Sequence, residues 1–206
     1  MSIGRRVFDA IERMDRQNYE GALNDIYGAI EDTAAREYGR GERSVYKRFL
    51  HDNMLLITRT AGLGGGILNL NLGYEHPDTE LDAKGVCTFE SVIYHAVRCG
   101  LYHEGKLPPN IRFVPERTFR MKDGGVELPA DLIHGFIIAV VVAPVNSGNQ
   151  LPDQCGAVIG ERLPVRMNAL WGQRYRYNWI VGAIIPEPIE RADQTEWSGQ
   201  RKGPSV

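Results

Sequence analysis

The sequence predicts a mainly α-helical protein with one small β-hairpin and an irregular C-terminal extension. Apolar side chains between residues 2 and 59 recur at steps of three and four, which is typical of helices with one buried face. The same spacing returns between residues 87 and 107. By contrast, two short runs that favour strands flank Asp123-Gly124-Gly125, and this pattern predicts a β-hairpin over residues 111–128.

Length and composition limit the class of protein. The chain has 206 residues, of which 43% are hydrophobic, so it can bury one sizeable core. A formal net charge of −2 argues against a protein that coats nucleic acid, and any RNA contact would be a local patch. We expect one domain over residues 1–186 and a flexible, polar tail over residues 187–206.

The expected location is the cytoplasm. Three cysteines with no Cys-x-x-Cys spacing do not suggest a disulfide framework. The first 15 residues contain no continuous apolar segment of the kind found in a secretory signal. The longest apolar run, Phe136 to Ala143, is too short to span a bilayer, so no membrane association is predicted.

The first part of the chain predicts three helices, over residues 2–16, 18–38 and 42–59. Ser2 can cap the first, and the Gly39-Arg40-Gly41 segment is a stop signal for the second. One face of the third helix is basic, and a basic face is either solvated or in contact with phosphate. Its members are Arg43, Lys47, Arg48 and Arg59, of which Lys47 and Arg48 are the candidate RNA contacts.

A glycine-rich run at residues 62–66 does not fit a nucleotide-binding loop. No Gly-Lys-Ser/Thr follows it, and Ile67 occupies a position where the dinucleotide motif requires glycine. We interpret the run as a helix stop followed by a mobile loop. Residues 67–85 then predict a long loop with one short extended piece, and loops of this length often serve function or partner contact.

The second half of the chain is less regular. Residues 129–143 favour a buried helix, although their β-branched run would also fit a strand. Beyond Pro144 the pattern weakens, and residues 174–179 alternate as a strand does before an apolar run over 180–185. Interleaved arginines and aromatics can stack bases, but a strand with one buried aromatic face explains the alternation equally.

The densest chemistry lies at the end of the helix predicted for residues 87–107. Its last turns contain Arg98, Cys99, Tyr102, His103 and Glu104. With α-helical geometry Arg98 lies nearly opposite the apolar stripe, and His103 lies about 140° round the axis from Arg98. A permanently charged planar donor beside a side chain that exchanges protons near neutral pH suits work on a phosphodiester.

The segment Arg98-Cys-Gly-Leu-Tyr-His103 resembles the Arg-x4-His signature of the HEPN superfamily, the higher-eukaryote and prokaryote nucleotide-binding domains. Residues 18–38 also resemble an early helix of that superfamily, so the resemblance covers about half of the chain. It implies a HEPN-like helical bundle that forms a homodimer. It also implies a metal-independent endoribonuclease that leaves 2′,3′-cyclic phosphate ends and needs no cofactor.

The resemblance also implies roles for individual residues. His103 would act on the 2′-hydroxyl or the leaving oxygen, and Arg98 would stabilise the developing phosphorane charge. Glu104 could orient His103, and Tyr102 could stack on or hydrogen-bond the substrate. Many active members carry a polar residue such as Asn where this chain has Cys99. The alternative is therefore a catalytically inactive module that binds nucleotide or RNA, or that dimerises.

Two other interpretations concern the same helix. His95, Cys99 and His103 are spaced i, i+4, i+8, but successive ligands on one straight helix would be about 6 Å apart and could not reach one ion, so no metal site is predicted. A thiol–imidazole pair of Cys99 and His103 would lack an orienting group and an oxyanion hole. In a purely structural interpretation, Arg98 pairs with an acid and His103 lies on the apolar side of the helix.

Overall fold

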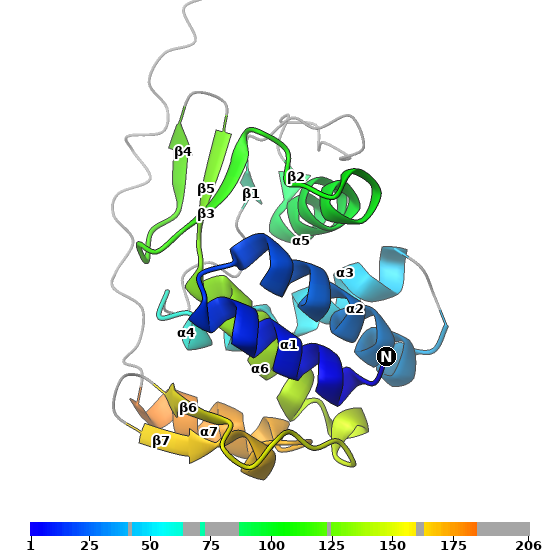
Figure 1. The fold of residues 1–206 in the computed structure, drawn as a ribbon, viewed down its shortest axis with the longest axis vertical. Helices are drawn as coiled ribbons and strands as arrows, with labels where there is room; N and C mark the ends of the chain where they lie inside the picture. The colour runs from blue at the N-terminus through cyan, green and yellow to red at the C-terminus, as the bar shows by residue number, and fades with distance from the viewer. Residues whose placement is uncertain (41–42, 64–70, 73–86, 123–124, 160–162, 185–206) are drawn as a thin grey trace, which may run out of the picture.

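The computed structural model describes residues 1–40, 43–63, 71–72, 87–122, 125–159 and 163–184. The tail predicted for residues 187–206 and most of the loop predicted for residues 67–85 lie outside the described residues. The prediction of a mainly α-helical protein with small sheets is confirmed (Figure 1).

Helices α1 (Ile3–Asp15) and α2 (Tyr19–Tyr38) pack side by side, as Figure 1 shows. The Ser2 hydroxyl accepts a hydrogen bond from the Arg5 N–H at 3.2 Å, and the Asn18 side chain accepts one from the Gly21 N–H at 3.0 Å. Each cap satisfies a backbone donor that the first turn leaves free. Both helices therefore begin where the sequence predicted.

The single helix predicted for residues 42–59 is wrong, because the chain forms two helices, α3 (Arg43–Asp52) and α4 (Met54–Thr60). Asn53 separates them and is buried. Its side-chain amide donates to the Phe49 carbonyl at 2.8 Å. Such a bond from an asparagine side chain competes with the backbone ladder, and this competition accounts for the break.

Residues 87–107 begin with a short strand and continue as helix. Strand β2 (Cys87–Thr88) pairs antiparallel with β1 (Asn71–Leu72), so the short extended piece predicted within residues 67–85 is present. Helix α5 (Phe89–Val92) follows, and the Thr88 hydroxyl accepts from the Ser91 N–H at 3.3 Å. The helix then continues as η1 (Ile93–Glu104), which has π-helical hydrogen bonding.

The predicted hairpin is confirmed over β4 (Arg120–Lys122) and β5 (Gly125–Pro129), which pair antiparallel. Its first strand was predicted to begin at residue 111, and this part is wrong. Residues 111–114 form a separate strand, β3 (Ile111–Val114), which pairs in parallel with the other edge of β5. The sheet order is therefore β3-β5-β4.

Helix α6 (Asp131–Val142) confirms the helix predicted near residues 129–143, and a 3₁₀ turn, η2 (Pro144–Asn146), follows it. The helix contacts α1, α2 and α4 and is buried along nearly its whole length. Its contact with α4 is close at Gly135, where an added Cβ would lie 2.5 Å from the Ile57 carbonyl oxygen. One cluster of buried apolar side chains draws members from α1 through α7.

The C-terminal part is more regular than the sequence predicted. Strands β6 (Gly156–Ile159) and β7 (Leu163–Arg166) form an antiparallel pair, and a 3₁₀ turn, η3 (Met167–Ala169), follows. The strand predicted over residues 174–179 is wrong, because Arg174–Ile184 form helix α7. Tyr177 and Val181, four residues apart, are buried in its inner face. None of the described helices is long and apolar enough to cross a membrane.

Candidate functional site

The π-helical hydrogen bonding of η1 changes which side chains share a face. Bonds in a π-helix join residue i to residue i+5, so residues five apart lie on successive turns of the same side. Arg98 and His103 are five apart. The separation of about 140° expected between them assumed α-helical geometry and is wrong for this helix. The structure brings the two residues toward the same side of η1.

Arg98 is held between a carboxylate and two aromatic rings. Its Nη2 donates to both Glu31 carboxylate oxygens, at 3.1 and 3.2 Å. Its guanidinium carbon lies 5.3 Å from the Tyr94 ring centroid and 5.0 Å from that of Tyr102. Burial lowers the pKa of Arg98, but the charge and hydrogen bonds of Glu31 outweigh it and the pKa is raised. Only 16% of the side chain is exposed, because the carboxylate and the rings cover most of it.

Tyr102 lies next to both predicted catalytic residues. The Arg98 guanidinium lies over the Tyr102 ring. The centroids of the Tyr102 and His103 rings are 5.1 Å apart, and the two rings meet edge to face. Tyr102 is 70% exposed and His103 is also exposed, so His103 does not lie on the apolar side of the helix. The structure therefore brings the three residues together, with Tyr102 and His103 exposed and Arg98 partly covered beside them.

The two other supporting residues differ in their contacts. Cys99 is half-buried, and its side-chain hydrogen bond contributes to the raised pKa of Arg98. Glu104 is exposed, and among the described residues no hydrogen bond joins its carboxylate to His103. The structure thus gives Cys99 a contact at the site and gives Glu104 no orienting contact.

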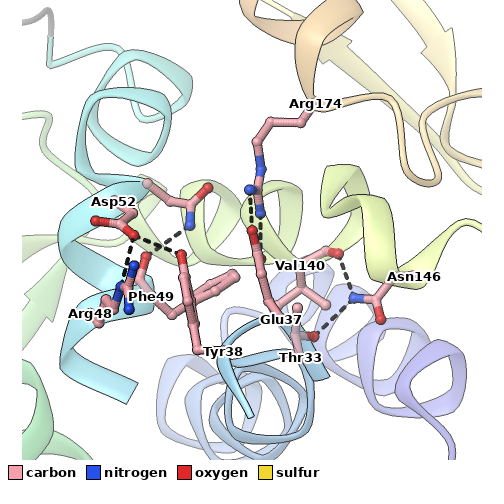
Figure 2. Close-up of polar contacts among 10 residues, drawn as sticks. Thr33, Glu37, Tyr38, Arg48, Phe49, Asp52, Val140, Asn146 and Arg174 are labelled. Atoms are coloured by element: carbon pink, nitrogen blue, oxygen red, sulfur yellow. Dashed lines mark hydrogen bonds and ion pairs between the residues drawn. The ribbon is translucent and has the colours of Figure 1, made fainter. Parts of the chain in front are cut away.

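The candidate RNA contacts on α3 belong to a different set of interactions. Arg48 pairs with Asp52 at 3.5 Å and lies over the Tyr38 ring at 4.6 Å. The Tyr38 hydroxyl donates to Asp52 at 2.9 Å, which completes the network seen in Figure 2. Lys47 beside it is half-buried. Arg48 is therefore already partly neutralised within its own helix.

The described residues offer no ready metal site. No group of three or more His, Cys, Asp or Glu side chains among them could hold an ion. His95, the first member of the i, i+4, i+8 series, is buried, with only 5% of its surface exposed.

Sequence reasoning missed several polar pairs that join distant parts of the chain. The buried Glu90 carboxylate lies 2.9 Å from His51 Nδ1, and the Asn146 side chain donates to the Thr33 hydroxyl at 2.9 Å. Figure 2 shows the second of these contacts. Buried polar side chains need such partners, but no local spacing indicates which residue will provide one.

Comparison with known proteins identifies the family. The family model described as Rv1289 matches residues 2–191, so the chain belongs to the Rv1289 family. No curated protein and no solved structure matches the chain. The family description names no activity, and a proposal for the function therefore rests on the side chains of the site.

Proposed function

We propose that this member of the Rv1289 family is a HEPN-like, metal-independent endoribonuclease whose Arg98 and His103 act on an RNA phosphodiester. One observation supports this most directly: both side chains contact the ring of Tyr102, at 5.0 and 5.1 Å. His103 exchanges a proton with the 2′-hydroxyl or the leaving oxygen, and Arg98 stabilises the developing charge. The products end in 2′,3′-cyclic phosphate.

The proposal includes a homodimer in the cytoplasm. Two copies of η1 would face each other and form a composite site, as in the superfamily that the Arg98–His103 segment resembles. Tyr102, with 70% of its surface exposed, offers a ring face to a base of the RNA. Cys87, Cys99 and Cys155 are free thiols, which suits a reducing compartment.

A second candidate function is favoured by the Glu31–Arg98 pair. Because both oxygens of Glu31 accept from Arg98, a phosphate must compete with a carboxylate already in place. This pairing fits a catalytically inactive module that binds nucleotide or RNA, or that dimerises. In that case Arg98 mainly attaches η1 to α2, since Glu31 belongs to α2.

Cleavage of a mixed RNA pool, with parallel thermal melts, tests the proposal. Arg98→Ala and His103→Ala should each reduce the cleavage rate by about 10²–10⁴. Arg98→Lys should restore little, because lysine lacks the planar fork of donors. Cleavage should survive EDTA. Arg98→Ala leaves the Glu31 carboxylate unpaired, which could itself destabilise the protein. The double variant Glu31→Gln/Arg98→Ala removes that charge as well, so it tests the loss of Arg98 in a stable protein.

Glu31→Gln alone separates the two candidate functions. Glutamine has nearly the size of glutamate but no charge, so the change removes the competing carboxylate. If the protein is a nuclease, this variant should cleave RNA at least as fast as the parent protein. In an inactive module the same change would lower the melting temperature and produce no cleavage. Stable variants at Arg98 and His103 with parent activity, or a strict monomer in sedimentation at micromolar concentration, would contradict the nuclease.

A further inference from the structure

Helix α7 presents two aromatic rings to solvent. Its inner face is anchored by Tyr177, whose hydroxyl lies 2.9 Å from the Thr60 hydroxyl of α4. On the opposite face Tyr175 is 89% exposed and Trp179 is 71% exposed. Because they are four residues apart, the two rings stand on adjacent turns of the same face. Large aromatic side chains exposed together are typical of a binding surface.

Two arginines lie beside these rings. Arg176 follows Tyr175 and is exposed. Arg59 reaches α7 from α4, and its Nη1 would lie 3.7 Å from a Cβ at Gly182, one turn beyond Trp179. Neither arginine forms an ion pair within the part of the chain that the structure describes. The eleven residues of α7 include no Asp or Glu, so the surface is locally positive although the whole chain is not.

The size and charge of this surface decide its occupant. A stable interface with a second copy buries about 800 Å² per partner, whereas α7 is only about 16 Å long and offers two large rings. A membrane surface needs a broad apolar face, but Asn178 and Arg176 border the two rings. Stacking of bases needs only ring faces with cations nearby for the phosphates.

We propose that single-stranded RNA binds across α7, with bases stacked on Tyr175 and Trp179 and phosphates contacted by Arg176 and Arg59. This inference rests on the proposed function, since it takes RNA as the substrate. The α7 surface is separate from the Arg98 site. Helix α2 is joined to Arg98 through Glu31 and to Arg174 of α7 through Glu37. These two glutamates lie about 9 Å apart along α2 and about 120° apart around it.

Binding of a short fluorescein-labelled single-stranded RNA, followed by anisotropy in the His103→Ala background to prevent cleavage, tests the inference. Trp179→Ala and Tyr175→Ala should each raise the Kd by about tenfold, and Trp179→Phe should retain most of the affinity. Gly182→Glu places a carboxylate beside Arg59 and should also weaken binding. Gly182→Ala is its matched control and should bind as the His103→Ala protein does, since its Cβ makes only an ordinary contact.

The outcomes separate this inference from the proposed function. In one outcome, RNA binds to the full chain, Trp179→Ala weakens this binding, and the parent protein never cleaves the RNA. This outcome supports the α7 surface and contradicts the nuclease. Cleavage by the parent together with unchanged RNA affinity in Trp179→Ala and Tyr175→Ala overturns the α7 surface alone. In a third outcome, the same two variants leave RNA affinity unchanged but lose self-association in sedimentation, or lose binding to anionic phospholipid vesicles. Either result also overturns the α7 surface as an RNA site.

Discussion

The guanidinium of Arg174 donates to both carboxylate oxygens of Glu37, at 2.5 and 2.8 Å, and so joins the first turn of α7 to the end of α2 (Figure 2). Both side chains are largely buried, with exposed fractions of 23% and 17%. Burial lowers the pKa of Arg174, but the hydrogen bond and charge of Glu37 raise that pKa by more, so the guanidinium keeps its charge. This contact connects residues 137 positions apart and fixes the start of α7.

Arg174→Ala should lower the free energy of unfolding by about 2 kcal/mol, because it leaves the largely buried Glu37 carboxylate without its donor. A double-mutant cycle with Glu37→Ala, measured by urea denaturation, should give a coupling energy of about 1 kcal/mol or more. Arg16→Ala is the control. Its pair with Glu12 is exposed, with fractions of 74% and 44%, and should contribute less than about 0.5 kcal/mol. A coupling energy near zero for Arg174 and Glu37 would show that the contact does not hold α7.

Gly135→Ala should destabilise the protein by about 2 kcal/mol, although alanine favours helix over glycine by nearly 1 kcal/mol. The added Cβ would lie 2.5 Å from the Ile57 carbonyl oxygen and 2.9 Å from Ile57 Cγ2, so α4 and α6 must move apart. Gly182→Ala is the matched control within a helix, because its nearest contact is an ordinary 3.7 Å. Thermal unfolding should show opposite shifts for the two variants, and equal shifts would contradict the close packing.

Local signals in the sequence were sufficient for α1, α2 and α6. Ser2 and Asn18 are cap residues whose side chains need only a backbone donor three residues away, so their role can be predicted without knowledge of the fold. The apolar content of residues 131–142 allowed either a strand or a helix, and the helix was preferred. For α1 and α2 the decisive contacts lie within the element itself.

The errors have a common physical origin in contacts between distant residues. Alternating arginine and tyrosine over residues 174–177 mimics a strand, whereas the helix depends on burial of Tyr177 beside α4 and on the Glu37 contact. A break at Asn53 depends on which way one side chain turns. The residue content of the candidate site was visible in the sequence, but the pairing of Arg98 with Glu31 and the π-helical geometry of η1 were not.

Asn146→Ala should lower the free energy of unfolding by about 2 kcal/mol. The buried Asn146 amide donates to the Thr33 hydroxyl at 2.9 Å and to the Val140 carbonyl at 2.8 Å, so its loss removes two buried hydrogen bonds (Figure 2). Asn149→Ala is the control, because among the described residues the half-buried Asn149 side chain donates to the Asn146 carbonyl alone, at 3.1 Å. Urea denaturation should give a clearly lower free energy of unfolding for the Asn146 variant than for the Asn149 variant. The reverse order would exclude this network as a source of stability.

Asp131 occupies the first position of α6. Its carboxylate lies 3.4 Å from His134 Nδ1 and accepts from Arg117 Nε at 2.7 Å. The hydrogen bond from His134 and then the hydrogen bond from Arg117 lower the pKa of Asp131, while burial partly opposes them. A negative charge at a helix N-terminus is also stabilised by the helix dipole.

A carboxylate whose pKa is lower in the folded state contributes stability that is present above its unfolded pKa, near 4, and that is lost as the pH falls through the folded value. Asp131→Asn should therefore be less stable than the parent at pH 7, and the difference should shrink steadily below about pH 4. Urea denaturation between pH 2 and 7 measures both effects. Asp15→Asn, at an exposed position without an ion pair among the described residues, should leave the pH profile nearly unchanged. A constant difference between Asp131→Asn and the parent across this range would mean that Arg117 and His134 do not stabilise the ionised carboxylate.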